Sequence, residues 1–216
     1  SFNQMARKLE ERRLIRMLVS RVARDLAATG PSLEAGYRDV TILFLRSRVS
    51  ESTPRKAGEL FQQLRLQLSE ISRLSSRHGG DIDKVMGEKI LIVFSHHAGA
   101  ADAAERARRL IDDLIQAGRD RRLPIPWTGG LHAGKVISGL LGAGNRQDMT
   151  VIGDPVNAAA RLESLTHHLS QDAVIASDEV VQWLADRSAF VAHGTVQVKG
   201  KRQPLTIYVK STAIQT

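Results

Sequence analysis

Asn157 and Arg161 lie four residues apart in a segment whose residue types favour a helix. Asp154 can cap a helix and Pro155 suits a first helical turn, so we expect a helix over residues 154–165. Side chains at i and i+4 share one helical face, and a guanidinium fixed there can stabilise negative charge. The ordinary alternative is a solvated Arg and an Asn in the first turn.

Two histidine pairs, His96-His97 and His167-His168, superficially resemble metal ligands. Neighbouring residues point to different faces, so we interpret these side chains as exposed loop histidines. The chain contains no cysteine, which excludes disulfides, thiolate metal sites and cysteine nucleophiles.

The 216 residues carry a net charge of +8, and residues 1–30 hold seven Lys or Arg against three Asp or Glu. A basic balance suggests nucleic acid, a phosphate-rich ligand or a membrane surface as partner. Aromatic residues make up only 4%, which argues against a base-stacking platform. We therefore favour a basic amphipathic helix next to an anionic membrane over nucleic-acid binding.

The apolar pattern divides the chain into an N-terminal helix within residues 1–30 and an α/β (α+β) sandwich over residues 37–212. In the second segment we expect strands at 39–46, 81–86, 89–95, 127–131 and 136–141, helices at 54–77, 100–116 and 154–165, short strands near Val174, Val196 and Ile207, and a helix near 178–185. The pattern Gly130-x-His132-x-Gly134 indicates close strand packing, with His132 a core residue rather than a base.

Five patterns, in this order and spacing, resemble a class III nucleotidyl cyclase catalytic domain. They are Arg38-x-Val40-Thr41-x-Leu43-Phe44, His78-Gly79-Gly80-x-Ile82-Asp83-Lys84-x-x-Gly87-Glu88, Gly130-x-His132-x-Gly134 with Gly139-x-x-Gly142, Thr150-Val151-Ile152-Gly153-Asp154-x-Val156-Asn157-x-x-x-Arg161, and Val198-Lys199-Gly200-Lys201. The resemblance implies a ferredoxin-like palm with a mostly antiparallel sheet and flanking helices. It also implies cyclisation of ATP or GTP with two Mg²⁺ or Mn²⁺ ions, in sites formed between two domains head to tail.

The opening residues Phe2-Asn3-x-Met5 and the helix after them resemble the end of a HAMP domain. This resemblance implies that residues 1–30 are a signalling helix below a membrane sensor, and that the cyclase-like domain is cytoplasmic.

The resemblance also assigns substrate contacts. Lys84 occupies the purine-selecting position, and its ammonium, which only donates hydrogen bonds, favours adenine N1 over guanine N1. Thr150 is its partner position, with Ile152 beside it. Asn157 would orient the ribose and Arg161 would stabilise charge on the α-phosphate. Either Lys199 or Lys201 would contact the triphosphate, and an exposed basic turn explains both nearly as well.

The sequence departs from this family at the metal site. The first metal carboxylate is expected two residues after Phe44, where this chain has Arg46. A guanidinium has no lone pair to give to Mg²⁺, although it could contact a triphosphate directly. Val49-Ser50 replaces the usual Gly-Phe of the phosphate turn, and the second metal position is Glu88 rather than Asp. We therefore expect impaired binding of Mg²⁺ or Mn²⁺.

Two hypotheses follow. The first is an adenylate-cyclase-type domain that is weakly active or inactive alone, as a homodimer, but that completes a site with an intact partner. The second is a pseudocyclase that binds nucleotide or only dimerises and passes on a signal. A diguanylate cyclase is disfavoured because Gly79-Gly80-Asp81 precedes the expected strand instead of lying at a hairpin tip.

Overall fold

The computed structural model of this chain describes residues 35–49, 57–143, 146–169, 172–197 and 204–212. The expected N-terminal helix, Ser50, Lys199 and Lys201 lie outside these residues. Within the described ranges, no helix is both long enough and apolar enough to span a membrane.

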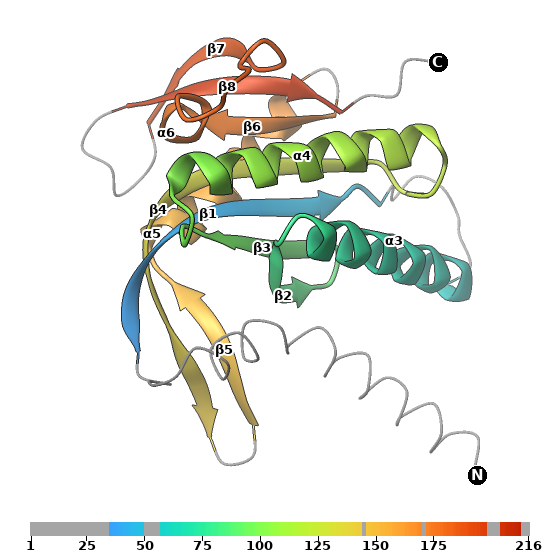
Figure 1. Ribbon diagram of the computed structural model, residues 1–216. Coiled ribbons are helices and arrows are strands. Elements are labelled where there is room, and N and C mark those ends of the chain that lie inside the picture. Colours follow the sequence, from blue (N-terminus) through green and yellow to red (C-terminus); the bar gives the residue numbers. More distant parts are fainter. Residues whose placement is uncertain (1–34, 50–56, 144–145, 170–171, 198–203, 213–216) are drawn as a thin grey trace.

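One sheet forms the centre of the molecule, in the order β2-β3-β1-β4-β6-β8-β7, with β5 paired to β4 (Figure 1). Its strands are β1 (Gly36–Ser47), β2 (Asp81–Met86), β3 (Lys89–Ser95), β4 (Trp127–Ala143), β5 (Arg146–Ile152), β6 (Ala173–Ser177), β7 (Val191–Val196) and β8 (Leu205–Ser211). The pairing of β4 with β6 is parallel, and the other strand pairs are antiparallel.

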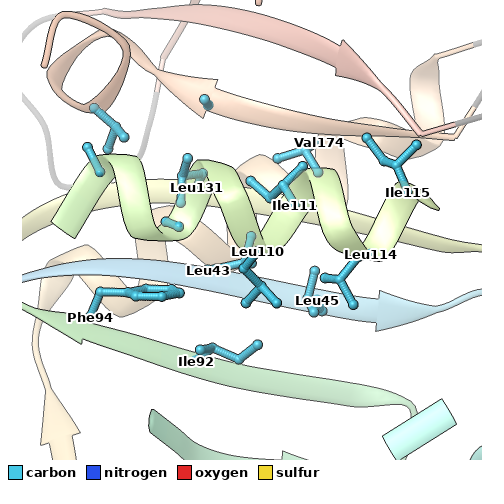
Figure 2. Close-up of a cluster of buried hydrophobic side chains, with 14 of the residues drawn as sticks. Leu43, Leu45, Ile92, Phe94, Leu110, Ile111, Leu114, Ile115, Leu131 and Val174 are labelled. Carbon is cyan, nitrogen blue, oxygen red and sulfur yellow. The ribbon is translucent and has the colours of Figure 1, made fainter. Parts of the chain in front are cut away.

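Helices cover both faces of this sheet. They are α3 (Ala57–Arg77), α4 (Ala100–Arg119), α5 (Asp154–Leu165), the 3-10 turn η1 (Thr166–His168) and the short α6 (Asp178–Val181). On one face, Leu43 and Leu45 of β1 pack with Leu110 and Leu114 of α4 (Figure 2). On the other face, neighbouring β1 residues pack against α5. Because both faces are covered, residues 40–45 are all buried. The expected α+β class is confirmed.

Helix α5 lies unusually close to β4 because two glycines leave room for it. A Cβ atom at Gly130 would lie 2.0 Å from the Ala159 carbonyl oxygen, and one at Gly134 would lie 2.7 Å from the Pro155 ring. These glycines are architectural as expected, but the element that they admit is helix α5 and not a neighbouring strand. His132, between them, is 1% exposed and its Nδ1 lies 2.8 Å from Ser177 Oγ, so it is a core residue as expected.

The structure differs from the predicted elements in three places. Strand β4 is continuous from Trp127 to Ala143, where we expected two strands around Ala133-Gly134. The break is absent because β4 pairs with β1 through Gly134, which lies opposite Val40. Strand β5 was not predicted, and the helix expected near 178–185 ends at Val181.

Candidate active site

Arg46 lies near the end of β1, on the sheet face that α5 covers. It is paired in register with Thr128 of β4, and it shares its face with Phe44, two residues earlier. Its side chain is 21% exposed. Arg46 therefore extends from the sheet toward the C-terminal end of α5.

The Arg46 guanidinium has two neighbours on that helix and its following turn. Nη1 lies 2.7 Å from His167 Nε2, and Nε lies 3.6 Å from Glu163 Oε1. Because a guanidinium can only donate, His167 must accept through Nε2, which leaves the ring proton on Nδ1. His167 is exposed, as expected. The sequence did not indicate that it would also be a hydrogen-bond partner of Arg46.

Glu163 is the buried counter-ion of Arg46. It is 1% exposed, and Thr128 Oγ1 donates to its Oε1 at 3.0 Å. Its Oε2 and the Arg46 Nε are buried without a hydrogen-bond partner among the described residues. A carboxylate removed from water needs a nearby cation, and the Arg46 guanidinium lies beside this one.

The two metal positions of the family lie next to each other in this structure. Glu88 is exposed in the turn between β2 and β3, and its carbonyl oxygen accepts from the Ser47 N–H at 2.8 Å. The donor set, however, is one carboxylate and one guanidinium. No group of three or more His, Asp or Glu side chains suited to a metal occurs in the part of the chain that the structure describes. Since Mg²⁺ requires oxygen ligands, these residues do not fit a two-metal centre.

The two residues expected to select the base, Lys84 and Thr150, both contact Asp83. Lys84 Nζ lies 3.9 Å from Asp83 Oδ2, and Thr150 Oγ1 donates to the same oxygen at 3.5 Å. The Val151 N–H donates to Asp83 Oδ1 at 3.2 Å, which ties β5 to β2. The Thr150 hydroxyl donates its hydrogen bond to Asp83. Its oxygen lone pairs can therefore accept a hydrogen bond from a ligand. Thr150 is buried, whereas the Lys84 side chain is 44% exposed.

Sequence reasoning missed Asp83 and Glu163 as site residues. Asp83 stands where the pairing of β2 with β3 shifts between Ile82 and Lys84, which no spacing rule indicated. Glu163 lies two residues after Arg161 on α5, outside the family motif. It is identified as a site residue only by its burial on the helix.

Asn157 and Arg161 both lie on α5, as the i and i+4 spacing predicts. Asn157 is exposed and Arg161 is half-buried. Pro155 stands in the first turn as expected. Asp154 was expected to cap the helix, but Gly153 is the N-cap residue and no side chain caps the helix. Ile152, just before it, is 51% exposed.

The expectation of an exposed loop histidine is wrong for His96. Its Nε2 lies 3.0 Å from Thr41 Oγ1, and its ring packs edge-on against Trp183. Burial lowers the pKa of His96, which favours the neutral ring. This contact belongs to the core and not to the candidate site.

The fold and the motif residues define a nucleotidyl cyclase catalytic domain. The family model for the adenylate and guanylate cyclase catalytic domain matches residues 34–211. The chain therefore belongs to this family, whose members generally use Mg²⁺ or Mn²⁺.

Relatives and solved structures agree with this assignment. The chain is 32% identical over 224 residues to an adenylate cyclase of Anabaena cylindrica, covering 96% of this chain and 44% of that protein. It thus spans less than half of this curated relative. The adenylyl cyclase CyaB from P. aeruginosa superposes with a TM-score of 0.67 at 26% identity, covering 82% of this chain and 95% of that one. A solved guanylyl cyclase matches with a TM-score of 0.64 at 26% identity, covering 81% and 92% of the two chains.

Replacing Arg46 should destabilise the fold through Glu163. We expect Arg46→Leu to lower the free energy of unfolding by about 3 kcal/mol, because it leaves a buried carboxylate without its cation. Adding Glu163→Gln should recover part of this loss, since a neutral amide needs no counter-ion. Urea denaturation of the two single variants and the double variant measures the coupling.

The matched control is Arg48→Leu, two residues away. It removes an ion pair in which Arg48 Nη1 lies 2.6 Å from Asp172 Oδ1 and the Arg48 side chain is 42% exposed. An exposed pair contributes about 0–1 kcal/mol. Equal losses for Arg46→Leu and Arg48→Leu would contradict the role given to Glu163.

Proposed function

We propose that this chain is an adenylate-type cyclase domain with a degenerate metal site, which is weakly active or inactive by itself. The observation that carries the proposal is Arg46, held against Glu163 and His167 at the position of a metal carboxylate. A guanidinium neither ligates a metal nor removes a proton from a ribose hydroxyl. Lys84, Thr150, Asn157 and Arg161 match the family motif.

The preference for ATP rests on Lys84 and Thr150. The Lys84 ammonium donates to adenine N1, whereas guanine N1 carries a hydrogen and repels a donor. The Thr150 hydroxyl, which donates to Asp83, can accept from the adenine amine. Both adenylyl and guanylyl cyclases are among the matched proteins, so the base is assigned from these residues alone.

The other substrate contacts follow the family motif. Asn157 orients the ribose, and Arg161 stabilises the charge that builds on the α-phosphate. Ile152 lies against the substrate beside Thr150, and Lys199 or Lys201 contacts the triphosphate. These groups bind and orient ATP and stabilise charge, but none of them replaces the missing metal carboxylate.

We further propose that the domain works in a head-to-tail pair. Catalytic domains of this family bind a nucleotide and act as dimers. A homodimer would carry Arg46 in both sites, whereas a heterodimer with an intact cyclase domain would combine that partner's carboxylates with this chain's Lys84, Asn157 and Arg161. Three exposed apolar side chains on β1, β4 and β5 suit such an interface: Tyr37, Ile137 and Ile152 are 75%, 42% and 51% exposed.

The cellular setting is part of the same proposal. Residues 1–30 act as a signalling helix that links the domain to an upstream membrane sensor, and the domain lies in the cytoplasm. The HAMP-like opening and the +4 charge of this segment support this assignment.

A second candidate is a pseudocyclase that binds nucleotide or dimerises as a regulatory module. The lack of a metal carboxylate at position 46 favours it. The retained Lys84, Asn157 and Arg161 favour the first candidate.

A cyclase assay separates the two candidates. We expect residues 1–216 alone to form little or no cyclic AMP from Mn²⁺-ATP, because Arg46 cannot hold a metal. Mixing the chain with a cyclase domain that has intact metal carboxylates but a substituted transition-state Arg should produce cyclic AMP. Arg161→Ala in this chain is the matched control and should abolish that gain. Robust turnover by the chain alone would contradict the degenerate site, and no gain on mixing would favour the pseudocyclase.

The purine preference has its own test at Asp83. We expect Asp83→Asn to reduce the preference for ATP over GTP by about tenfold, because an amide no longer fixes Thr150 as an acceptor. Binding of fluorescent ATP and GTP analogues measures the ratio. Asp81→Asn, on the same strand, should leave the ratio unchanged. A preference for GTP in the unsubstituted chain would remove the role assigned to Lys84.

A further inference from the structure

Strand β7 forms an edge of the sheet, and among the described strands it pairs with β8 alone. Its residues from Val191 to Thr195 are exposed, and Val191 is 67% exposed. A strand edge presents a row of backbone N–H and C=O groups to which a further strand can pair. This edge lies at the top of Figure 1, whereas the hairpin of β4 and β5 extends at the bottom. It is therefore separate from the surface assigned to the head-to-tail pair.

The composition of β7 distinguishes it from the other strand edges in the described part of the chain. Strands β2 and β5 each contain acidic and basic side chains, and charge is one feature that keeps a strand edge from pairing with another chain. The six residues of β7, Val-Ala-His-Gly-Thr-Val, include no Asp, Glu, Lys, Arg or Pro. Although the chain has a net charge of +8, two copies of this edge can therefore approach each other without repulsion between such charges.

The sequence of β7 is also nearly symmetric when it is read in both directions. An antiparallel pair centred on the middle of the strand places Val191 opposite Val196 of the partner subunit. The same register places Ala192 opposite Thr195 of the partner subunit. Val and Thr are β-branched residues, which are favoured in pairs across neighbouring strands. The side chains of β7 thus suit a second copy of β7.

The β-bulge in β7 makes this register possible. Residues opposite each other lie on the same face of a sheet, whereas in a regular strand Val191 and Val196, five residues apart, would lie on opposite faces. Here His193 has no counterpart in the pairing with β8, so the alternation shifts by one residue. Val191 lies opposite Val209 and Val196 lies opposite Leu205, and both β8 residues pack in the cluster on the α5 side. The two valines therefore share one face, as the symmetric register requires.

We propose that β7 pairs antiparallel with β7 of a second copy of this chain, with Val191 opposite Val196 of the partner subunit, so that one sheet continues through both molecules. A bulge usually disrupts pairing at an edge, but two identical strands carry the same extra residue and their lengths match. The contact is independent of the proposed cyclase activity. Because it uses a different edge from the head-to-tail pair, it would join such pairs into larger assemblies.

Disulfide cross-linking of residues 1–216 tests the register, because the chain contains no cysteine of its own. We expect a mixture of Ala192→Cys and Thr195→Cys to form a covalent dimer under mild oxidation. Residues directly opposite each other have Cα atoms about 5 Å apart, which is within the range of a disulfide. Either variant alone should give at least about tenfold less dimer, since its two cysteines would lie about 10 Å apart along the paired strands.

A mixture of Ala192→Cys and Ser69→Cys is the matched control for random collision, because Ser69 is exposed on α3. A yield in this control equal to that of the Ala192→Cys and Thr195→Cys mixture would overturn the proposal. Cross-linking of Ala192→Cys alone with the yield of that mixture would also overturn it, since that result indicates parallel strands.

A charge exchange tests the same contact without a covalent bond. The double variant Ala192→Lys/Thr195→Lys places lysines opposite each other, so sedimentation should show self-association weakened about tenfold. A chain with Ala192→Glu/Thr195→Glu should restore association when it is mixed with the lysine variant, and failure to restore it would contradict the register.

Both measurements are repeated with Tyr37→Asp, which places a charge in the apolar surface assigned to the head-to-tail pair. The cross-link at β7 should persist there, because Tyr37 lies on β1 and not on this edge. Loss of the cross-link with Tyr37→Asp would show that the head-to-tail contact causes it, and would overturn the β7 pairing while the head-to-tail proposal stands.

Discussion

The buried carboxylate of Glu163 constrains the whole candidate site. It is 1% exposed, so its charge must be balanced within the protein. The Arg46 guanidinium, with its Nε 3.6 Å away, provides that balance. The residue that stands at the first metal position, Arg46, is therefore also the cation paired with Glu163 beneath α5. A change at this position alters stability and chemistry together.

Backbone packing explains why Glu163 is buried at all. Helix α5 approaches β4 so closely that a Cβ atom at Gly130 would meet the backbone nitrogen of Glu163 at 2.5 Å. The same contact places the C-terminal end of α5, with His167 just beyond it, beside the end of β1. Two features of sequence, a glycine in β4 and a cation in β1, are thus coupled through one helix. The α4 side of the sheet is an apolar core that holds β1 in place from behind.

Much of this arrangement could be predicted from sequence, because it depends on local pattern. The helix over 154–165, with Asn157 and Arg161 on it, follows from its period and from Pro155. The unusual residue at position 46 follows from counting along the motif. The partners of Arg46 could not be predicted in this way, since Glu163 and His167 are more than a hundred residues away in sequence.

The pair expected to select the base shows the same limit. Lys84 and Thr150 were assigned from the family pattern, but Asp83 connects them only because β5 lies beside β2, and β5 was not predicted. Its first residues, Arg146-Gln147-Asp148, are polar and give no strand signal. Likewise, Gly134 indicated a break in β4, although a glycine there serves the packing of Pro155.

The central claim is that position 46 presents a cation paired with Glu163 and that no divalent ion binds between positions 46 and 88. A crystal of the chain grown with Mn²⁺ and a non-hydrolysable ATP analogue, measured at the manganese absorption edge, tests this directly. We predict no manganese peak beside Glu88, with the Arg46 guanidinium against Glu163. A manganese ion bound by Glu88, with Arg46 turned away from Glu163, would contradict the account.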